Sequence, residues 1–268
     1  MASLKRKHSV QYDAEDADDQ QRPVKRAKVA FIYFGSGVKL RVLSNFSGDP
    51  REDKKHNFDL KDITPAMERV CPEVRRWLTQ LGPHVHVPTS EHLWQALSKA
   101  GDLETFGLLL RGGWGSDLEE VFPLDPVVRA KKIHHWRVKT VDLVGILAKM
   151  AVHAKTSRRL GLNLRPDHAE GEFNPLYSFD DLLEQVWDDI LDWKMRTRPD
   201  AAHALRQTGD LLLVEFCRQA AKKEDGAATK VFWGGYYDEM QGRVLGANFM
   251  GKAMMRARAR LLNQQHPQ

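Results

Sequence analysis

Apolar positions recur with helical spacing over most of the chain, and only three short runs have the character of strands. Thr64 followed by Pro65 predicts a helix start, and Pro72 predicts a break in that helix. Glycine and proline residues within 155–178 predict a long loop. We therefore expect a mainly α protein, with strands at 29–34, 85–87 and 211–216, and helices at 65–81 (broken at Pro72), 90–100, 127–154, 180–194, 199–207 and 248–262.

The first 28 residues differ from the rest of the chain. Two basic clusters flank an acidic, glutamine-containing stretch at 13–21, and so little apolar surface predicts a disordered tail. Such clusters are typical of a two-part nuclear localisation signal, although a solvated basic tail has the same composition. We expect a nuclear, otherwise cytoplasmic, protein whose single domain covers 29–265, with insertions at about 47–86 and 155–180.

The composition excludes several classes of protein. No continuous apolar stretch reaches the ~18 to 20 residues of a membrane span, and no apolar segment of a secretory signal follows the charged amino terminus. Cys71 and Cys217 are too few for a disulfide scaffold or a four-cysteine zinc site. The 11 histidines have no ligand spacing, so we expect no metal. Lys and Arg exceed Asp and Glu by 41 to 36, which suits a phosphate-bearing ligand.

A helix start followed by a carboxylate carries the strongest candidate chemistry. Thr89 or Ser90 predicts the N-cap, and at about 100° per residue Glu91, Gln95 and Ser98 share an arc of about 60°. Leu93, Trp94 and Leu97 are expected on the other side. The free N–H groups of a first turn favour an ionised carboxylate, which could stabilise charge at an anomeric carbon or activate water. Acidic residues are also common in first turns for stability alone.

Glycine and aromatic residues gather at 231–237, and more glycines follow at 246–251. Glycine lets a backbone approach a ligand closely, and an aromatic ring such as Trp233 could stack on a base or cover a sugar. A helix that starts near Asn248 would direct N–H groups toward a phosphate. A glycine-rich turn with aromatic residues in the core has the same pattern. Neither a P-loop nor a GxGxxG sequence is present, and we expect no cofactor.

A further carboxylate, Glu215, stands at the end of the apolar run that follows Gly209. Carboxylates in such places are rarely left without a partner. Two interpretations stay open, because Glu215 could orient a group in an active site or bind an arginine such as Arg258.

Taken together, these segments resemble the NADAR (NAD- and ADP-ribose-associated, YbiA-like) superfamily. The resemblance extends over some 215 residues, in the order of the family's motifs. These are LSNF at 43–46, TSEH with QA at 89–96, TGD then LVE at 208–215, WGG at 233–235, and GxNxxGxxxM from Gly246 with the later Arg258. The chain departs from the family at Ser98, where a lysine is usual and Lys99 comes one place later, and at Gly235, where an aspartate is common.

The resemblance implies a mostly α-helical fold and hydrolysis of N-glycosidic bonds. Of the family's substrate classes, the basic tail favours ADP-ribose linked to guanine in DNA or RNA, and the alternative is a ribosylamine intermediate of riboflavin synthesis. Glu91 is the implied catalytic residue, and Lys99 or Lys39 the candidate for a Schiff-base nucleophile. The substrate-binding set implied by the motifs is Ser44, Asn45, Gln95, Trp233, Gly234, Gly235 and Asn248. The pair Lys194–Met195 corresponds to a family KF pair, which we assign to packing and contacts at the ligand edge.

Two hypotheses of another class remain. The departures at Ser98 and Gly235 are compatible with a reader that binds ADP-ribose or NAD without cleaving it. A nucleic-acid-binding protein would instead contact the phosphate backbone through basic residues, and would bind unmodified DNA with a strong dependence on salt. Under all of these interpretations we expect a monomer. The candidate backbone contacts are Lys131, Lys132, Arg137, Lys139, Arg158 and Arg159.

Overall fold

The computed structural model describes residues 27–32, 40–44, 56–112, 143–165, 180–217, 220 and 231–264. About 57% of the described structure is helical, and its strands are few and short, which confirms the mainly α class. Most of the tail at 1–28 lies outside the described residues. No helix in the described part of the chain has both the length and the apolar character needed to cross a membrane.

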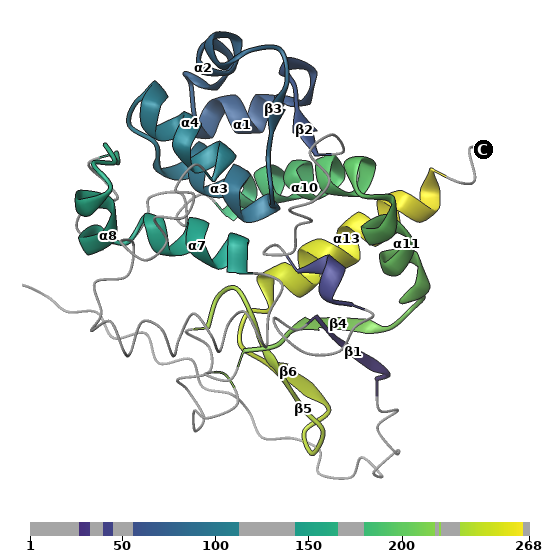
Figure 1. Cartoon of the computed structure of the whole chain (residues 1–268). Coiled ribbons are helices and arrows are strands. Elements are labelled where there is room, and N and C mark those ends of the chain that lie inside the picture. Colours follow the sequence, from purple (N-terminus) through teal and green to yellow (C-terminus); the bar gives the residue numbers. More distant parts are fainter. Residues whose placement is uncertain are drawn as a thin grey trace, which may run out of the picture.

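The first described helices form one group with a small two-stranded sheet (Figure 1). Thr64 accepts a hydrogen bond from Met67 N at the start of the first helix, as its place before Pro65 predicts. The group consists of the 3₁₀ turn η2 (Leu60–Asp62), the antiparallel strands β2 (Asn57–Phe58) and β3 (Val85–His86), and the helices α1 (Pro65–Val70), α2 (Val74–Leu81), α3 (Ser90–Lys99) and α4 (Leu103–Arg111). The 3₁₀ turn η1 (Arg41–Leu43) lies apart from this group and packs against α11.

Helix α4 has no counterpart among the predicted elements, although both of its ends carry a signal. Asp102 caps its start by accepting from Thr105 N at 2.8 Å, and Gly112 ends it with a left-handed backbone at φ 69°. Gly107 lies inside the helix, where glycine weakens the sequence signal. A Cβ built on Gly107 would lie 3.1 Å from Leu81, so the glycine lets α4 pack closely on α2.

The predicted helix at 127–154 and the predicted loop at 155–178 are partly wrong. Residues 127–142 lie outside the described part of the chain, and the remainder forms two helices, α7 (Leu143–Ala151) and α8 (Ala154–Arg159). His153 interrupts them because it adopts an extended backbone, with φ −66° and ψ 137°. The loop therefore begins after Arg159 and not at residue 155.

Three further helices lie in the described part of the chain, and their predicted positions at 180–194, 199–207 and 248–262 are confirmed to within three residues. They are α10 (Asp180–Thr197), α11 (Pro199–Gln207) and α13 (Phe249–Asn263). Helices α10 and α13 pack against each other (Figure 1). Arg256 and Arg260 of α13 join the two helices, because both form ion pairs with Asp188 of α10.

The remaining strands of the described structure lie at the amino-terminal end of α13. Strand β1 (Val29–Ile32) pairs in parallel with β4 (Leu212–Glu215), so that Val29 stands opposite Leu212. The hairpin of β5 (Tyr236–Asp238) and β6 (Arg243–Leu245) joins them through a bridge between Phe216 and Gly235. Because α13 packs on β4, this sheet is anchored to the helical core.

Part of the segment that we expected to be an insertion belongs to the core. Within 47–86, residues 56–86 are described, and Phe58, Met67 and Leu78 among them are fully buried. The ring of Phe58 meets the ring of Trp193 on α10 edge to face, at a centroid distance of 6.0 Å. Removal of this segment would therefore expose core residues of α10.

Candidate active site

Helix α3 is buried on all its faces from Ser90 to Ser98. Thr89 is its N-cap, as predicted, and accepts a hydrogen bond from His92 N. Glu91 lies in the first turn with 4% of its surface exposed. The arc of polar residues predicted from helical spacing is therefore a buried face, where a carboxylate without a role would be costly.

Glu91 is held by a neighbour on the same face. Gln95 Nε2 donates a hydrogen bond of 2.7 Å to Glu91 Oε1, one helical turn away. Ser98, the next residue on that face, donates instead to the backbone oxygen of Trp94, at 2.7 Å. The helix thus satisfies Ser98 by itself and pairs Gln95 with the carboxylate.

An aromatic cluster joins α3 to the glycine-rich segment, although the two are far apart in sequence. The rings of Trp94 on α3, Trp187 on α10 and Trp233 lie within 5.4 to 6.1 Å of one another, measured between centroids. Trp233 also meets Phe249 at 5.4 Å, at the start of α13. Trp94 follows Glu91 by one turn, so Trp233 comes close to the candidate carboxylate's helix. Trp94 therefore faces this cluster and borders the polar face.

Gly234 and Gly235 are buried and pack directly against β4. Gly235 N donates to the backbone oxygen of Glu215 at 2.7 Å, and a Cβ on Gly234 would stand 2.7 Å from that same oxygen. A Cβ on Gly235 would stand 2.8 Å from Val244. The two glycines are thus required for close approach of backbone to backbone. The aspartate that is common in the NADAR motif at the position of Gly235 would have no room here without a shift.

Three N–H groups at the start of α13 are already engaged by the backbone. The N–H groups of Asn248, Phe249 and Met250 donate to the backbone oxygens of Gly234, Phe232 and Trp233, at 3.1 Å each. The phosphate site that we expected at this helix start therefore lacks these three donors. They hold the 232–234 segment against α13 and so place Trp233.

Asn248 itself serves the backbone of β4. Its Oδ1 accepts from Glu215 N at 3.0 Å, and its Nδ2 donates to Leu213 O at 2.9 Å. Its backbone is left-handed, with φ 49°, a conformation that asparagine tolerates better than most residues. Asn248 is buried, so its amide positions β4 and α13 and is not available in this arrangement to a phosphate.

Ser44 meets an ammonium group that the sequence analysis assigned to packing. Lys194 Nζ, in the last turn of α10, donates to the backbone oxygens of Leu43 and Ser44 at 3.1 and 2.6 Å. Lys194 and Ser44 are both buried. Met195 lies in the hydrophobic core, as the packing role requires. In the sequence, a lysine on an otherwise apolar helix face was the feature that indicated a buried ammonium group.

Of the two candidate lysine nucleophiles, Lys99 stands apart from Glu91. Lys99 is half-buried at the carboxyl end of α3, about 12 Å along the axis from Glu91 at 1.5 Å per residue. Its backbone oxygen accepts from Arg165 N. Lys39 and the substrate-binding candidate Asn45 lie outside the described residues.

Arg258 does not pair with Glu215. It donates to Thr208 Oγ1 and Leu211 O, both at 2.9 Å, and so ties α13 to the turn before β4. Burial lowers the pKa of Arg258 from its usual value. Within the described residues, Arg258 is therefore not the partner of Glu215, and both interpretations of that carboxylate stay predictions.

His92, next to the candidate carboxylate, is fully buried. Burial, with a smaller contribution from nearby His86, lowers the pKa of His92 to about 3, so its ring is neutral near pH 7. Thr89 Oγ1 lies 2.8 Å from its Nδ1. The ring also contacts the end of α4, since a Cβ on Gly112 would come within 2.6 Å of Nε2. His92 therefore supports the position of α3 and carries no charge into the site.

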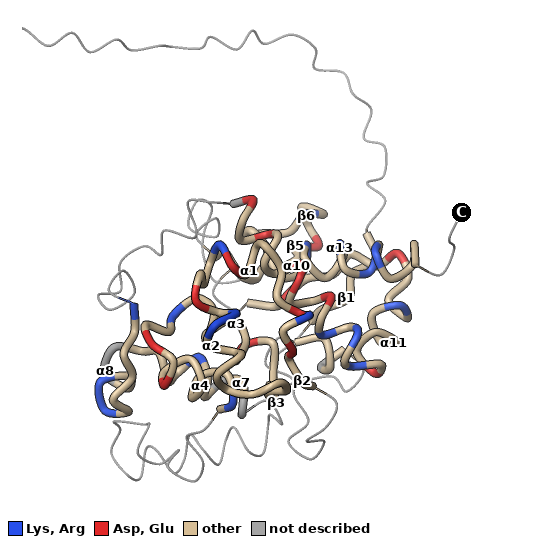
Figure 2. The backbone as a smooth tube through the Cα atoms, turned by 90° about the horizontal axis from the view of Figure 1, so that it is seen from above, with Lys and Arg blue, Asp and Glu red and all other residues tan. Residues whose placement is uncertain are grey.

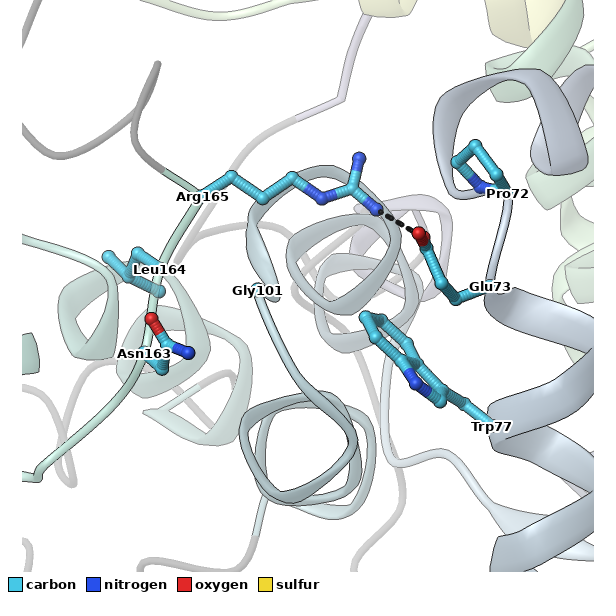
Figure 3. Close-up of a pocket in the computed structure, with 7 residues that line it drawn as sticks. All are labelled: Pro72, Glu73, Trp77, Gly101, Asn163, Leu164 and Arg165. Carbon is cyan, nitrogen blue, oxygen red and sulfur yellow. Dashed lines mark ion pairs between the residues drawn. The ribbon is translucent and has the colours of Figure 1, made fainter.

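A pocket of about 460 Å³ opens beyond the other end of α3 (Figure 3). Arg165 lines the pocket and donates hydrogen bonds to Ala100 O and Val70 O. Its Nη2 forms an ion pair with Glu73 Oε2 at 3.5 Å. Asn163 on the same wall donates to Asp102 at 2.9 Å. Because its charged and amide groups are engaged in closing the loop onto α3 and α4, this pocket is a poor candidate for catalysis.

Basic and acidic residues alternate over the described elements (Figure 2). Arg158 and Arg159 are exposed in the last turn of α8, where they could meet a phosphate backbone. The other basic residues proposed for such contacts, at 131–139, lie outside the described residues.

In the described part of the chain, no group of three or more His, Cys, Asp and Glu residues is placed to hold a metal ion.

Burial raises the pKa of the Cys71 thiol to about 11, so it is protonated at neutral pH.

Comparisons with protein-family models, with curated proteins and with solved structures yielded no match to this chain. The relation to the NADAR superfamily therefore rests on the motifs alone and stays a prediction.

Proposed function

We propose that this protein is an N-glycosidase that releases ADP-ribose from guanine in nucleic acid. The observation that carries the proposal is the buried Glu91, which Gln95 holds at 2.7 Å on a helix joined to Trp233 by an aromatic cluster. A carboxylate and an aromatic wall are the groups that an oxocarbenium-like transition state and a base require. The order of the NADAR-like motifs supports the choice of ADP-ribose and guanine.

The reaction needs few groups from the protein. The bond between the anomeric carbon and the guanine nitrogen breaks, and its electron pair stays on the nitrogen. Water adds to the anomeric carbon, and the proton that it loses ends on guanine, which gives ADP-ribose and unmodified base. Glu91 stabilises the positive charge that develops on the ribose, or accepts the proton of the attacking water on its way to the base.

The supporting residues act by position. Lys194 holds the backbone of Leu43 and Ser44, and we assign this segment to the ribose side of the site. Trp233 is half-buried, and its accessible part covers the sugar or the base. Gly234, Gly235 and Asn248 keep the 232–235 segment in place.

The test is the release of ADP-ribose from an oligonucleotide that carries ADP-ribosylated guanine, followed by mass spectrometry. Wild-type protein should restore guanine, and Glu91→Gln should lose at least about a hundredfold in rate, as removal of a general acid–base group does. Glu104→Gln is the matched control, because Glu104 occupies the first turn of α4 and is exposed. It should keep the wild-type rate.

Other outcomes would contradict the proposal in distinct ways. Retention of the modified strand without release would favour a reader of ADP-ribose. Activity on a ribosylamine phosphate alone would favour the metabolic hydrolase. Addition of sodium cyanoborohydride during turnover tests the lysine route, since a Schiff base at Lys99 or Lys39 would be reduced to a stable ADP-ribose adduct on that lysine.

A further inference from the structure

The nitrogen of the Gln95 side-chain amide has a hydrogen-bond partner, and its oxygen has none in the described structure. Its Nε2 donates to Glu91 Oε1, whereas its Oε1 is buried and has no hydrogen-bond donor in the described structure. Gln95 is 6% exposed. An unpaired buried acceptor is costly, so such an atom in a folded protein calls for a donor such as a water or a ligand hydroxyl.

The orientation of this amide follows from its neighbour. A carboxylate such as Glu91 only accepts hydrogen bonds, so the NH₂ group of Gln95 must face it. The carbonyl oxygen of Gln95 is then turned away from the carboxylate of Glu91. Gln95 Oε1 is therefore an acceptor without a donor on the same buried face of α3 as Glu91.

We propose that Gln95 Oε1 accepts a hydrogen bond from the 2-hydroxyl of the ribose whose glycosidic bond is cleaved. The inference rests on the proposed function. This hydroxyl adjoins the anomeric carbon, so an acceptor one helical turn from Glu91 would reach it when Glu91 faces the reacting centre. Hydrogen bonds to this hydroxyl strengthen in the transition state of glycoside cleavage, which makes Gln95 a binding residue with a share in the rate.

The experiment compares ADP-ribose with its analogue that lacks this 2-hydroxyl, by calorimetric titration. Wild-type protein should bind ADP-ribose about tenfold more tightly than the analogue, since one hydrogen bond contributes about 1.4 kcal/mol. Gln95→Met removes both polar atoms, and the two ligands should then bind equally. Gln95→Glu keeps an oxygen acceptor at this place, so part of the preference should remain.

Ser98→Ala is the control for folding and packing of α3. Ser98 is buried on the same face but donates only to its own helix, at Trp94 O, so the tenfold preference should persist. Thermal unfolding of all variants separates loss of the acceptor from loss of the fold.

The outcomes separate this inference from the proposed function. If wild-type protein neither binds nor releases ADP-ribose, the proposed function fails. If it releases ADP-ribose and the preference is unchanged in Gln95→Met, the inference alone is overturned. An absent preference in the wild type, with a lower turnover rate in Gln95→Met, would assign the acceptor to the attacking water and would also overturn the ribose contact.

Discussion

Lys194 Nζ donates a hydrogen bond of 2.6 Å to the backbone oxygen of Ser44, a residue 150 positions earlier in the chain. The bond closes the carboxyl end of α10 onto the LSNF segment. These carbonyl oxygens replace the water molecules that a buried ammonium group has lost. The carboxyl end of a helix also favours a positive charge. The candidate site thus depends on a charge that has no direct part in the proposed chemistry.

Replacement of this ammonium should destabilise the protein and disturb the LSNF segment. Lys194→Met keeps the length of the side chain but leaves the oxygens of Leu43 and Ser44 without this donor, so we expect a loss of about 2 to 3 kcal/mol in the free energy of unfolding. Urea unfolding measures the loss. Lys252→Met, at an exposed position of α13, should change stability by less than about 0.5 kcal/mol. Equal effects of the two variants would contradict the role of Lys194.

Gly251 should tolerate no side chain. A Cβ at this position would overlap Leu213 O and the side-chain amide of Asn248, both of which hold α13 against β4. Gly251→Ala should therefore lower the free energy of unfolding by about 2 to 3 kcal/mol, although alanine favours helices. Thermal unfolding measures the change, with Lys252→Ala as the neighbouring control. A stabilised Gly251→Ala protein would show that the contact relaxes at little cost.

The buried His92 predicts a loss of stability in mild acid. Its pKa is lowered from 6.5 to about 3 by burial, so below pH 6.5 the unfolded chain binds a proton that the folded protein does not. Stability is then lost progressively as the pH falls from 6.5 toward 3. Between pH 7.5 and 5.0 we expect a loss of about 2 kcal/mol in the free energy of unfolding.

Urea unfolding at both pH values, with His92→Gln, checks this assignment. The variant should lose most of the pH dependence, since glutamine does not titrate. His203→Gln, at an exposed position of α11, should keep the wild-type dependence. A His92→Gln protein with the full acid loss would place the responsible group elsewhere.

Trp233 should report ligand binding. It is half-buried and contacts Trp94 and Trp187, so a ligand against its accessible part should change the intrinsic fluorescence. Trp233→Leu should bind ADP-ribose about tenfold more weakly, because stacking on an aromatic ring contributes about 1 to 3 kcal/mol. Phe31→Leu, at an exposed aromatic on β1, should leave affinity unchanged. An unchanged affinity in Trp233→Leu would remove Trp233 from the ligand site.

Much of the fold was predictable because its signals are local. Thr64 and Thr89 cap their helices by hydrogen bonds within one turn, and Pro199 starts α11, so these boundaries follow from neighbouring residues. Helix α4 was missed because Gly107 weakened its pattern, and His153 divided a helix that periodicity alone would continue. The hairpin of β5 and β6 was missed, and the bridge from Gly235 to Phe216 joins two distant segments, which spacing does not predict.

For the candidate site, the sequence by itself determined that Glu91 and Gln95 share one face of a helix, since 3.6 residues per turn requires it. Only the tertiary structure decided that this face is buried and that Trp233 meets Trp94. It also decided that the first N–H groups of α13 are taken up by the 232–234 backbone. Helical spacing depends on bonds within one segment, whereas burial and pairing depend on which distant segments pack together, and no single segment encodes that choice.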